Sequence, residues 1–331
     1  MKVAINGFGR IGRTALKAIL ERGNVEVVAI NDLTDTETLA HLLKYDSVYR
    51  IWNHEVGFDE TDLIVDKKKI HCYAEKEPVK LPWRELGVDV VLECTGHFLT
   101  TEDAEAHIRA GAKKVILSSP AKDETPTYVM GVNAEKYNGE KIISNASCTT
   151  NCIAPVMKIL EDNFGIDKSL MTTIHSYTAD QNLVDGPHKD LRRARAAALN
   201  IVPTSTGAAK ATFKTIPSLK GKFDGLAIRV PSPVVSLSDI VAVLKKETDL
   251  KDLEKVFRTA EESDYAGILA TTDEPVVSTD LIGNKNSAIV DLSLTQLIDG
   301  NLVKIIAWYD NERGYSERLV DLAELIGKKN V

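Results

Sequence analysis

The chain has 331 residues, of which 44% are apolar and 27% are charged, and its formal net charge is −7. At roughly 150 residues per domain, this length favours two domains. The composition is ordinary for a folded globular protein, which excludes disordered, collagenous and coiled-coil classes. The acidic balance argues against a dedicated nucleic-acid site, and no apolar run approaches the ~20 residues that span a bilayer.

The N-terminus and the cysteines indicate a cytoplasmic protein. The first residues, MKVAINGFGR, lack the continuous apolar segment of a signal peptide. Four cysteines are too few for a disulfide framework, so we expect free thiols in a reducing compartment at Cys72, Cys94, Cys148 and Cys152. We expect neither a membrane segment nor a metal site.

The first half of the chain alternates short apolar runs with helical patterns. Apolar runs typical of buried strands lie at 3–5, 25–31, 88–94 and 114–118. Helical patterns cover 10–22 and 103–110. Because near-continuous apolar strands that alternate with helices are typical of parallel sheets covered on both faces, we expect an α/β fold with an N-terminal Rossmann-type doubly wound parallel sheet.

After residue 147 the pattern changes. A helical pattern covers 148–164, with Pro155 inside it, where we expect a kink. Long β-type runs then lie at 170–177, 226–230, 236–244 and 288–308. Asp299-Gly300 splits the last run and is a strong hairpin signal. These runs predict an α+β second domain with a mainly antiparallel sheet.

Two further segments complete the second half. The chain ends in an amphipathic helical pattern, which we expect to stop at Gly327. One long stretch, 178–200, has no regular pattern. Structureless stretches of that length in a compact domain are usually functional.

A dinucleotide fingerprint follows the first predicted strand. In Gly7-Phe8-Gly9-Arg10-Ile11-Gly12, the first glycine permits a tight turn, the second lets the backbone approach a pyrophosphate, and the third lets helix and strand pack closely. Asp32 ends the second strand, where a carboxylate reaches the adenosine ribose and repels the 2′-phosphate of NADP. Ser118, at the end of a later strand, is a further candidate contact. The alternative is a Gly-rich turn beside a solvated aspartate.

A cysteine and a histidine are candidates for covalent catalysis. With Ser147 as N-cap, Cys148 lies in the first turn of a helix, where the helix dipole and free N–H groups favour the thiolate. Cys152, one turn deeper, is expected to pack in the core. His175 ends an apolar strand and would be the base of a Cys–His pair. A thiolate that attacks an aldehyde beside a nicotinamide gives a thiohemiacetal and, after hydride loss, a thioester.

Basic residues and a helix start offer anion sites. Leu191–Arg195 carries three arginines within the irregular stretch. Thr206-Gly207 opens a further helical pattern, and helix N-termini bind anions. Arg229 ends a strand directly before Pro231. A solvated charged face is the ordinary alternative for such runs.

Seven motifs, taken together, resemble the sequence pattern of a known enzyme family. The chain resembles the phosphorylating glyceraldehyde-3-phosphate dehydrogenase family in NGFGRIGR at 6–13, SNASCTTNC at 144–152, HSYTADQ at 175–181, LRRARAAA at 191–198, TSTGAAK at 204–210, RVPSP at 229–233 and WYDNERGYS at 308–316. The resemblance covers the whole chain in order, and SNASCTTNC is its most specific part.

The resemblance implies roles for individual residues. Cys148 would carry the acyl group and His175 would be its base. Positions that match cofactor contacts, beside the glycines of the fingerprint, are Arg10, Ile11, Asp32, Lys76, Ser118 and Asn311. Positions that match the site for the phosphate of the substrate are Thr178, Arg193 and Arg229. Positions that match the site for the attacking phosphate are Ser147, Thr149, Thr206 and Gly207.

The resemblance also implies an activity and an architecture. The activity is oxidation and phosphorylation of D-glyceraldehyde 3-phosphate to 1,3-bisphosphoglycerate, with NAD and inorganic phosphate. The implied organisation is an NAD-binding domain at 1–147, completed by a C-terminal helix at 313–331, and a catalytic domain at 148–312. A homotetramer is implied, with the stretch around 178–200 near the cofactor of a neighbouring subunit.

Three alternatives remain open at this point. Erythrose-4-phosphate dehydrogenase is a close relative, although it tends to lack the TSTGAAK pattern present at 204–210. An NAD-sensing or RNA-binding protein on this fold would not need both the cysteine and the histidine. A cysteine hydrolase would not explain the Gly-rich fingerprint or Asp32.

Overall fold

The structure is a computed structural model that describes residues 1–328, and these form two compact units. Unit 1 contains Met1–Tyr128, Lys136–Ala146 and the chain from Ser316 onward, and unit 2 contains Val129–Glu135 and Ser147–Tyr315. Across the described residues, no helix combines the length and apolarity that crossing a bilayer requires.

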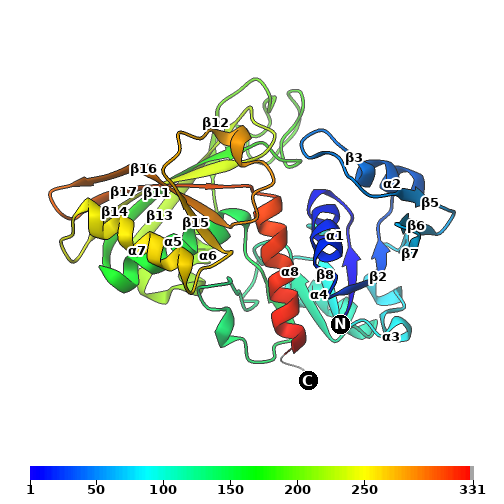
Figure 1. Ribbon diagram of the computed structural model, residues 1–331. Coiled ribbons are helices and arrows are strands. Elements are labelled where there is room, and N and C mark those ends of the chain that lie inside the picture. Colours follow the sequence, from blue (N-terminus) through cyan, green and yellow to red (C-terminus); the bar gives the residue numbers. More distant parts are fainter. Residues whose placement is uncertain (329–331) are drawn as a thin grey trace. The chain divides into compact units, whose positions relative to one another are not determined.

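Unit 1 is built on an eight-stranded sheet with the order β10-β9-β8-β1-β2-β7-β6-β5 (Figure 1). The six strands from β10 to β7 pair in parallel, and β6 and β5 extend the sheet antiparallel. The strands are β1 (Lys2–Asn6), β2 (Glu26–Asn31), β5 (Val56–Phe58), β6 (Asp62–Val65), β7 (Lys68–Tyr73), β8 (Val90–Glu93), β9 (Lys114–Leu117) and β10 (Ile142–Ser144). A separate two-stranded sheet pairs β3 (Tyr45–Asp46) with β4 (Arg50–Ile51).

The helices of unit 1 begin and end where the local sequence dictates. Helix α1 (Arg10–Arg22) ends at Gly23, whose φ of 69° is left-handed and suits glycine. Helix α4 (Thr101–Arg109) begins after Thr100, whose side chain accepts a hydrogen bond from the Asp103 N–H. The other helical elements are α2 (Thr36–Lys44), α3 (Trp83–Leu86), α8 (Arg313–Lys328), which continues from unit 2, and the 3-10 turn η1 (Pro78–Lys80). A second 3-10 turn, η2 (Ala134–Lys136), begins in unit 2 and ends in unit 1.

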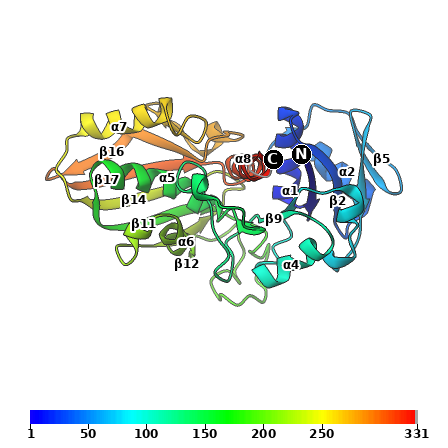
Figure 2. The same ribbon diagram turned by 90° about the horizontal axis from the view of Figure 1, so that it is seen from below.

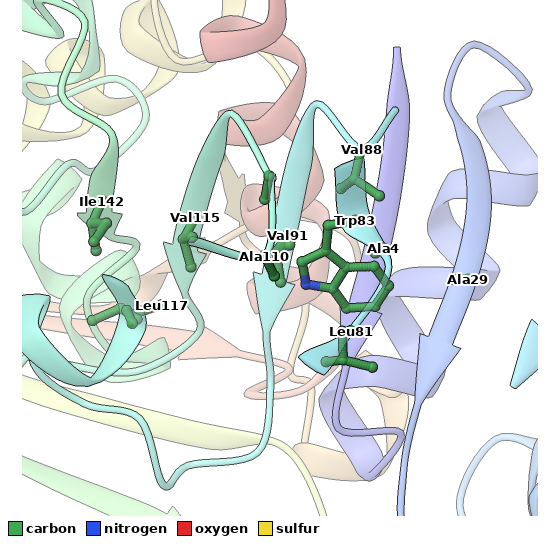
Figure 3. Close-up of a cluster of buried hydrophobic side chains, with 12 residues drawn as sticks. Ala4, Ala29, Leu81, Trp83, Val88, Val91, Ala110, Val115, Leu117 and Ile142 are labelled. Carbon is green, nitrogen blue, oxygen red and sulfur yellow. The ribbon is translucent and has the colours of Figure 1, made fainter. Parts of the chain in front are cut away.

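The two faces of the unit 1 sheet are both covered. Neighbouring strand residues point to opposite faces, so Ala4 packs in a buried cluster with Ala104 of α4, whereas Ile5 faces Gly12 of α1. Figure 2 shows α1 and α4 on opposite sides of the sheet. Trp83 belongs to the cluster on the α4 face and lies beside Leu81 and Val88 (Figure 3). This is the predicted doubly wound arrangement.

Unit 2 contains a seven-stranded sheet with the order β12-β13-β11-β14-β17-β16-β15. Four of its six strand pairs are antiparallel, and the pairs β11–β13 and β15–β16 are parallel, so the predicted mainly antiparallel sheet is confirmed. The strands are β11 (Ile166–Ser176), β12 (Val202–Ser205), β13 (Phe223–Val230), β14 (Ser236–Leu244), β15 (Leu269–Thr272), β16 (Ala288–Ile298) and β17 (Leu302–Tyr309).

Three helices pack against this sheet (Figure 1). They are α5 (Cys148–Asn163), α6 (Ala208–Thr215) and α7 (Leu250–Glu262), with 3-10 turns η3 (Pro217–Leu219) and η4 (Ser278–Leu281). Alternate residues of β11, Met171, Thr173 and His175, are buried, and α5 packs against this strand. Leu170, on the other face of the strand, is 66% exposed. The pleat of β11 therefore turns His175 toward the helices.

Several predicted elements match the structure closely, and others are wrong. Helix 10–22, strand 236–244 and the hairpin at Asp299-Gly300 are confirmed, and 178–200 contains no helix or strand. Strand β11 begins at Ile166 rather than at residue 170. The C-terminal helix does not stop at Gly327 but continues to Lys328, and a Cβ on Gly327 would collide with the Met1 side chain. Here glycine permits close packing and does not end the helix.

Candidate active site

A cavity of about 450 Å³ lies in unit 1 at the carboxyl ends of β1, β2 and β8. Because β1 lies between β2 and β8, this is the point where the strand order reverses, and doubly wound sheets bind ligands there. Four predicted cofactor residues line the cavity: Gly7, Gly9, Asp32 and Lys76. Further lining residues are Asn6, Asn31, Leu33, Glu75, Cys94, Thr95, His97 and Phe98.

The three fingerprint glycines fit a dinucleotide. Gly7 has a φ of 91°, and a Cβ there would lie 2.7 Å from the backbone of Cys94. A Cβ on Gly12 would collide with the Gly7 carbonyl oxygen. Gly9 has open space around its Cβ position, and no side chain caps the N-terminus of α1 after it. The helix start therefore presents backbone N–H groups to an open space that suits a pyrophosphate.

Asp32 is held in place by two backbone donors. Its Oδ2 accepts a hydrogen bond from the Phe8 N–H at 2.7 Å, and its Oδ1 accepts one from the Thr34 N–H at 3.0 Å. A carboxylate offers about four acceptor sites, so lone pairs remain for ribose hydroxyls. The carboxylate also fixes the Gly-rich turn, which the sequence reasoning did not anticipate.

The remaining predicted cofactor residues do not line this cavity. The Arg10 guanidinium pairs with Asp46 at 2.6 Å and lies over the Tyr49 ring. Ile11 and Gly12 lie within α1, behind the turn. The Ser118 N–H donates to the Glu93 carbonyl at 2.9 Å.

Unit 2 brings the predicted thiol and imidazole together. The Ser147 side chain accepts a hydrogen bond from the Thr150 N–H at 3.0 Å, which confirms Ser147 as the N-cap of α5. Cys148 is therefore the first residue of the helix. Its Sγ lies 3.5 Å from Nε2 of His175, at the end of β11. The contact joins residues 27 positions apart in the chain, and it places a base beside a nucleophile.

The protonation of this pair differs from the expectation. Burial raises the pKa of the Cys148 thiol above its ordinary value, although the nearby Arg229 charge opposes this change. Burial and Arg229 together lower the pKa of His175 to about 3. Desolvation thus opposes the helix start, and both pKa shifts favour the neutral thiol and imidazole over the thiolate that the helix start alone would favour. A neutral thiol faces a neutral imidazole that can accept its proton.

The Nδ1 atom of His175 lies against both a donor, Arg229, and an acceptor, the Ser176 carbonyl. Arg229 Nη1 lies 2.7 Å from His175 Nδ1 and donates to the Ser176 carbonyl at 2.9 Å, while Nδ1 also lies 2.8 Å from that carbonyl. Donation from Nδ1 to the carbonyl leaves Nε2 free to accept the thiol proton. Acceptance by Nδ1 from Arg229 places the hydrogen on Nε2 instead. The two contacts favour opposite tautomers, so the position of Arg229 decides the basicity of Nε2.

A second arginine lies close to Arg229. Arg193 contacts Thr204 of β12, and β12 pairs with β13, the strand that carries Arg229. Burial lowers the pKa of Arg229; the charge of Cys148 opposes this change and the Arg193 charge adds to it. Arg193 donates from Nε to Thr204 Oγ1 at 3.0 Å and forms an ion pair with Asp180. Within the described residues, the Nε of Arg229 is buried without a hydrogen-bond partner. Two neighbouring guanidiniums with spare donors are suited to a phosphate.

The other predicted residues of unit 2 have the following places. Thr149 is buried and its Oγ1 lies 2.9 Å from the Tyr309 hydroxyl. Asn311 accepts hydrogen bonds at Oδ1 from the hydroxyls of Ser176 and Ser236, at 2.9 and 3.1 Å. Because its oxygen is engaged by both hydroxyls, its amide nitrogen is turned away from them.

Three more residues of the predicted phosphate sites are Thr178, Thr206 and Gly207, and Cys152 is the predicted packing residue. Thr178 begins the irregular stretch, and its carbonyl accepts from the Gln181 N–H at 2.9 Å. Thr206 Oγ1 accepts from the Ala208 N–H at 3.2 Å at the start of α6, where Gly207 is the N-cap without a side-chain cap. Cys152 is fully buried, as expected for a packing residue.

Sequence reasoning missed several residues of this region. Tyr309 bonds both Thr149 and Thr173 through its hydroxyl, at 2.9 Å each, and its ring lies edge-on to His175. It lies inside the quoted motif at 308–316, where its alternation with Trp308 marks it as buried. Asp180, the partner of Arg193, also lies inside a quoted motif. No pattern of the sequence pairs it with an arginine 13 residues away.

Comparisons with known proteins agree with this geometry. A family model described as the glyceraldehyde 3-phosphate dehydrogenase NAD binding domain matches residues 1–101, and one described as the C-terminal domain of the same enzyme matches residues 147–311. The glyceraldehyde-3-phosphate dehydrogenase of Priestia megaterium is 55% identical over 333 residues, which cover 100% of this chain and 99% of that protein.

Other bacterial relatives are similar to the same extent. Glyceraldehyde-3-phosphate dehydrogenase of Geobacillus stearothermophilus and glyceraldehyde-3-phosphate dehydrogenase 1 of Bacillus subtilis are each 54% identical over 333 residues, with 100% of this chain and 99% of the relative covered. The matches give NAD as the cofactor, and they do not favour the erythrose-4-phosphate alternative. The chain belongs to the glyceraldehyde-3-phosphate dehydrogenase family.

Proposed function

We propose that the chain oxidises and phosphorylates D-glyceraldehyde 3-phosphate to 1,3-bisphosphoglycerate, with NAD and inorganic phosphate, in glycolysis and gluconeogenesis. The observation that carries this proposal is the 3.5 Å contact between Cys148 Sγ and His175 Nε2, beside two arginines. A nucleophile, a base and an anion site in one region are what acyl transfer from a phosphorylated aldehyde requires.

Cys148 and His175 carry the covalent chemistry. The sulfur attacks the aldehyde carbon as the thiol proton passes to His175 Nε2, and the imidazolium returns this proton to the carbonyl oxygen, which gives a thiohemiacetal and restores the neutral imidazole. His175 then takes the hydroxyl proton of the thiohemiacetal while hydride leaves its carbon, and a thioester on Cys148 results. Bound NAD supplies the hydride acceptor. Inorganic phosphate attacks the thioester carbonyl, and the sulfur of Cys148 is the leaving group.

Two sets of residues hold the two phosphates. Thr178, Arg193 and Arg229 hold the phosphate of the aldehyde, because the two guanidiniums supply charge-assisted donors. The attacking phosphate is held by Ser147, Thr149, Thr206 and Gly207, where the start of α6, whose N-cap Gly207 has no side chain, adds backbone N–H groups.

We further propose that residues 1–147 and the helix at 313–331 form the NAD-binding domain, and that 148–312 form the catalytic domain; residues 329–331 lie outside the described part. The cavity of unit 1 would hold the cofactor through Gly7, Gly9, Gly12, Asp32 and Lys76, with further contacts from Arg10, Ile11, Ser118 and Asn311. The open space at Gly9 and the backbone-anchored carboxylate of Asp32 support this assignment.

A homotetramer in the cytoplasm is the proposed working form. The irregular stretch exposes large apolar side chains, with Leu183 82% and Leu199 84% exposed, and Leu170 on the open face of β11 is 66% exposed. Apolar groups in such numbers favour contact with further copies of the chain. All four cysteines are free thiols, which suits a reducing compartment. Light scattering of the purified protein should give about four times the chain mass of 36.3 kDa.

The reaction is tested by following NADH formation from D-glyceraldehyde 3-phosphate with and without inorganic phosphate. We expect sustained turnover only with phosphate, because the thioester otherwise retains the acyl group. Erythrose 4-phosphate under the same conditions should turn over more slowly. Sustained turnover without phosphate would indicate hydrolysis and would contradict the proposal.

A further inference from the structure

A chain of five buried polar side chains lies beneath the cofactor cavity and takes no part in the proposed chemistry. We call Trp83, His107, Glu93, Asn6 and Asn31 the Glu93 chain. Trp83 and His107 are fully buried, Glu93 is 2% exposed and Asn6 is 1% exposed. The members come from α3, α4, β8, β1 and β2, so the chain links the cluster of Figure 3 to the strand ends that form the cavity.

The first half of the Glu93 chain fixes the tautomer of His107. The Trp83 indole N–H donates to His107 Nδ1 at 3.0 Å. Because an indole nitrogen only donates, Nδ1 is the acceptor, and the hydrogen of the neutral imidazole lies on Nε2. This Nε2–H points at Glu93 Oε2, 3.0 Å away. The indole therefore sets which group His107 offers to the carboxylate.

The second half passes this orientation to the wall of the cavity. The Asn6 amide nitrogen donates to Glu93 Oε2 at 2.6 Å, which turns the Asn6 oxygen toward the Asn31 amide nitrogen, 2.7 Å away. Asn31 then accepts at Oδ1 from the Glu75 N–H and donates to the Glu75 carbonyl, both at 2.9 Å. Reversal of either amide would place two donors against each other.

Glu93 also fixes a second wall of the cavity. Its Oε1 accepts from the Thr95 N–H at 2.8 Å and from the Thr95 hydroxyl. Thr95 lies against the Gly7 turn, since a Cβ on Gly7 would be 2.7 Å from the Thr95 nitrogen. One carboxylate therefore holds residues on two sides of the cavity, Thr95 directly and Glu75 through Asn6 and Asn31.

Stability alone does not account for this arrangement. Removal of a carboxylate and an imidazole from water is costly, and apolar side chains of similar volume are often at least as stabilising in such places. Asn6 and Asn31 of the Glu93 chain line the cavity, and so do Glu75 and Thr95, which the chain holds by hydrogen bonds. We propose that Glu93 and His107 are positioning residues for NAD, an inference that rests on the proposed placement of the cofactor in this cavity.

Glu93→Gln is the sharpest variant, because it preserves shape and changes only the hydrogen-bonding groups. Glu93 accepts four hydrogen bonds, from Asn6, His107 and twice from Thr95. A glutamine NH₂ group toward Asn6 and His107 meets two donors, and toward Thr95 it meets the backbone N–H. Neither amide orientation satisfies the site.

We expect Glu93→Gln to raise the Kd for NAD at least tenfold and the KM for NAD in parallel. The KM for the aldehyde and the rate of iodoacetamide labelling of Cys148 in the absence of NAD should stay within twofold. Trp83→Phe keeps an aromatic ring at this position and leaves Glu93 unchanged, but it removes the indole N–H and so frees His107 to take either tautomer. The Kd for NAD should therefore rise about threefold.

Arg22→Ala is the matched control for general destabilisation of unit 1. Arg22 ends α1 and pairs with Glu317, Asp321 and Glu324 of α8, away from the cavity. This variant should lower the melting temperature and leave the Kd for NAD unchanged. If Glu93→Gln and Trp83→Phe lower the melting temperature in the same way and both bind NAD as tightly as the native protein, the inference is wrong. If the native protein itself fails to bind NAD, the proposed cofactor site fails instead.

Discussion

The two units each contain a buried histidine with charged and polar partners, and the two sites are built on opposite principles. In the Glu93 chain the indole, the imidazole and the Asn6 amide are all oriented by their hydrogen bonds, and the carboxylate accepts four hydrogen bonds. In the Cys148 cluster, by which we mean Cys148, His175, Arg229 and the Ser176 carbonyl, the contacts conflict. His175 Nδ1 faces both a cation and a carbonyl, and the described residues give Arg229 Nε no partner.

This difference matches the roles proposed for the two sites: the Glu93 chain positions other residues, and the Cys148 cluster takes part in the reaction. A network whose donors and acceptors match in one arrangement resists change, which suits a group that positions others. A cluster with a spare guanidinium donor and an ambiguous imidazole is stabilised by a ligand that engages the arginine. The anion that binds Arg229 would also leave His175 Nδ1 to the Ser176 carbonyl, and Nε2 would then accept the thiol proton. Substitutions in the two sites should therefore differ in kind.

The largest effect is expected for Cys148→Ser. A hydroxyl does not ionise near neutral pH and is a poor nucleophile beside a neutral imidazole, so kcat should fall by at least about a thousandfold. NAD binding should be retained, because the cavity proposed for the cofactor belongs to unit 1. Steady-state assays and NAD titrations of the same preparation test both statements.

Labelling by iodoacetamide checks that Cys148 is the reactive thiol. Burial raises the pKa of Cys72 to about 11 and that of Cys94 to about 12, and Cys152 is fully buried. Cys148 has both a base and a cation beside it, so it should label first by mass spectrometry. Faster labelling of Cys152 would reverse the assignment of the nucleophile and the packing residue.

The next largest effect is expected for Arg193→Ala. Loss of a charge-assisted hydrogen bond of roughly 1.5–3 kcal/mol should lower kcat/KM for glyceraldehyde 3-phosphate about ten- to a hundredfold. Unphosphorylated glyceraldehyde should lose much less, because it has no phosphate to hold. Arg229→Ala should show the same preference together with an additional loss on both aldehydes, since Arg229 also contacts His175. Equal losses on both aldehydes for Arg193→Ala would indicate a structural role.

The sequence alone predicted those parts of the fold whose determinants are local. The limits of α1 follow from Gly9 and Gly23, and β14 ends in the continuous apolar run 240–244. The strands between residues 45 and 73 were missed, because they are short and half exposed and therefore carry no strong pattern.

The sites show the same division. The Gly-rich turn and the N-cap Ser147 are local signals, and the structure agrees with them. His107 lies among charged residues of α4 and resembles a surface residue, because its partners are 14 and 24 positions away. The protonation of Cys148 could not be predicted either, since the helix start is visible in the sequence but the burial that opposes it is not.

A change in pH should distinguish His175 from an ordinary histidine. The folded protein keeps the pKa of His175 at about 3, against 6.5 for an unperturbed histidine, so the unfolded chain binds more protons between these values. Above pH 6.5 the imidazole is neutral in both states, so the lowered pKa costs no stability. As the pH falls from 6.5 toward 3, the unfolded chain binds the proton first and the folded protein loses stability. From pH 7 to pH 5 the loss should be about 2 kcal/mol.

His175→Asn isolates this contribution. Urea unfolding of the native protein and of the variant, at pH 7 and pH 5 and at one protein concentration, gives the difference of interest, because the other titrating groups cancel. The native protein should lose about 2 kcal/mol more than the variant. An equal loss in both proteins would show that His175 takes up a proton in the folded state.

The smallest effect on kcat/KM is expected for substitution of Asp32, which shares features with both sites. Its carboxylate is anchored by the Phe8 and Thr34 N–H groups, as a positioning residue is, yet it lines the cavity and keeps acceptor sites for a ligand. An ionised carboxylate at the adenosine ribose repels the 2′-phosphate of NADP, and the residues that follow, Leu33, Thr34 and Asp35, offer no cation. The native protein should therefore strongly prefer NAD.

Asp32→Ala should reduce the ratio of kcat/KM for NAD to that for NADP by about tenfold, which corresponds to ~1.4 kcal/mol. Part of the change should appear as weaker binding of both cofactors, since the variant also releases the Phe8 N–H and loosens the turn before α1. Asp35→Asn is the matched control: this carboxylate caps α2 through the Thr38 N–H and does not line the cavity. It should leave the ratio within twofold. Comparable kcat/KM values for the two cofactors in the native protein would contradict the role of Asp32. An unchanged ratio in Asp32→Ala would place the discrimination elsewhere.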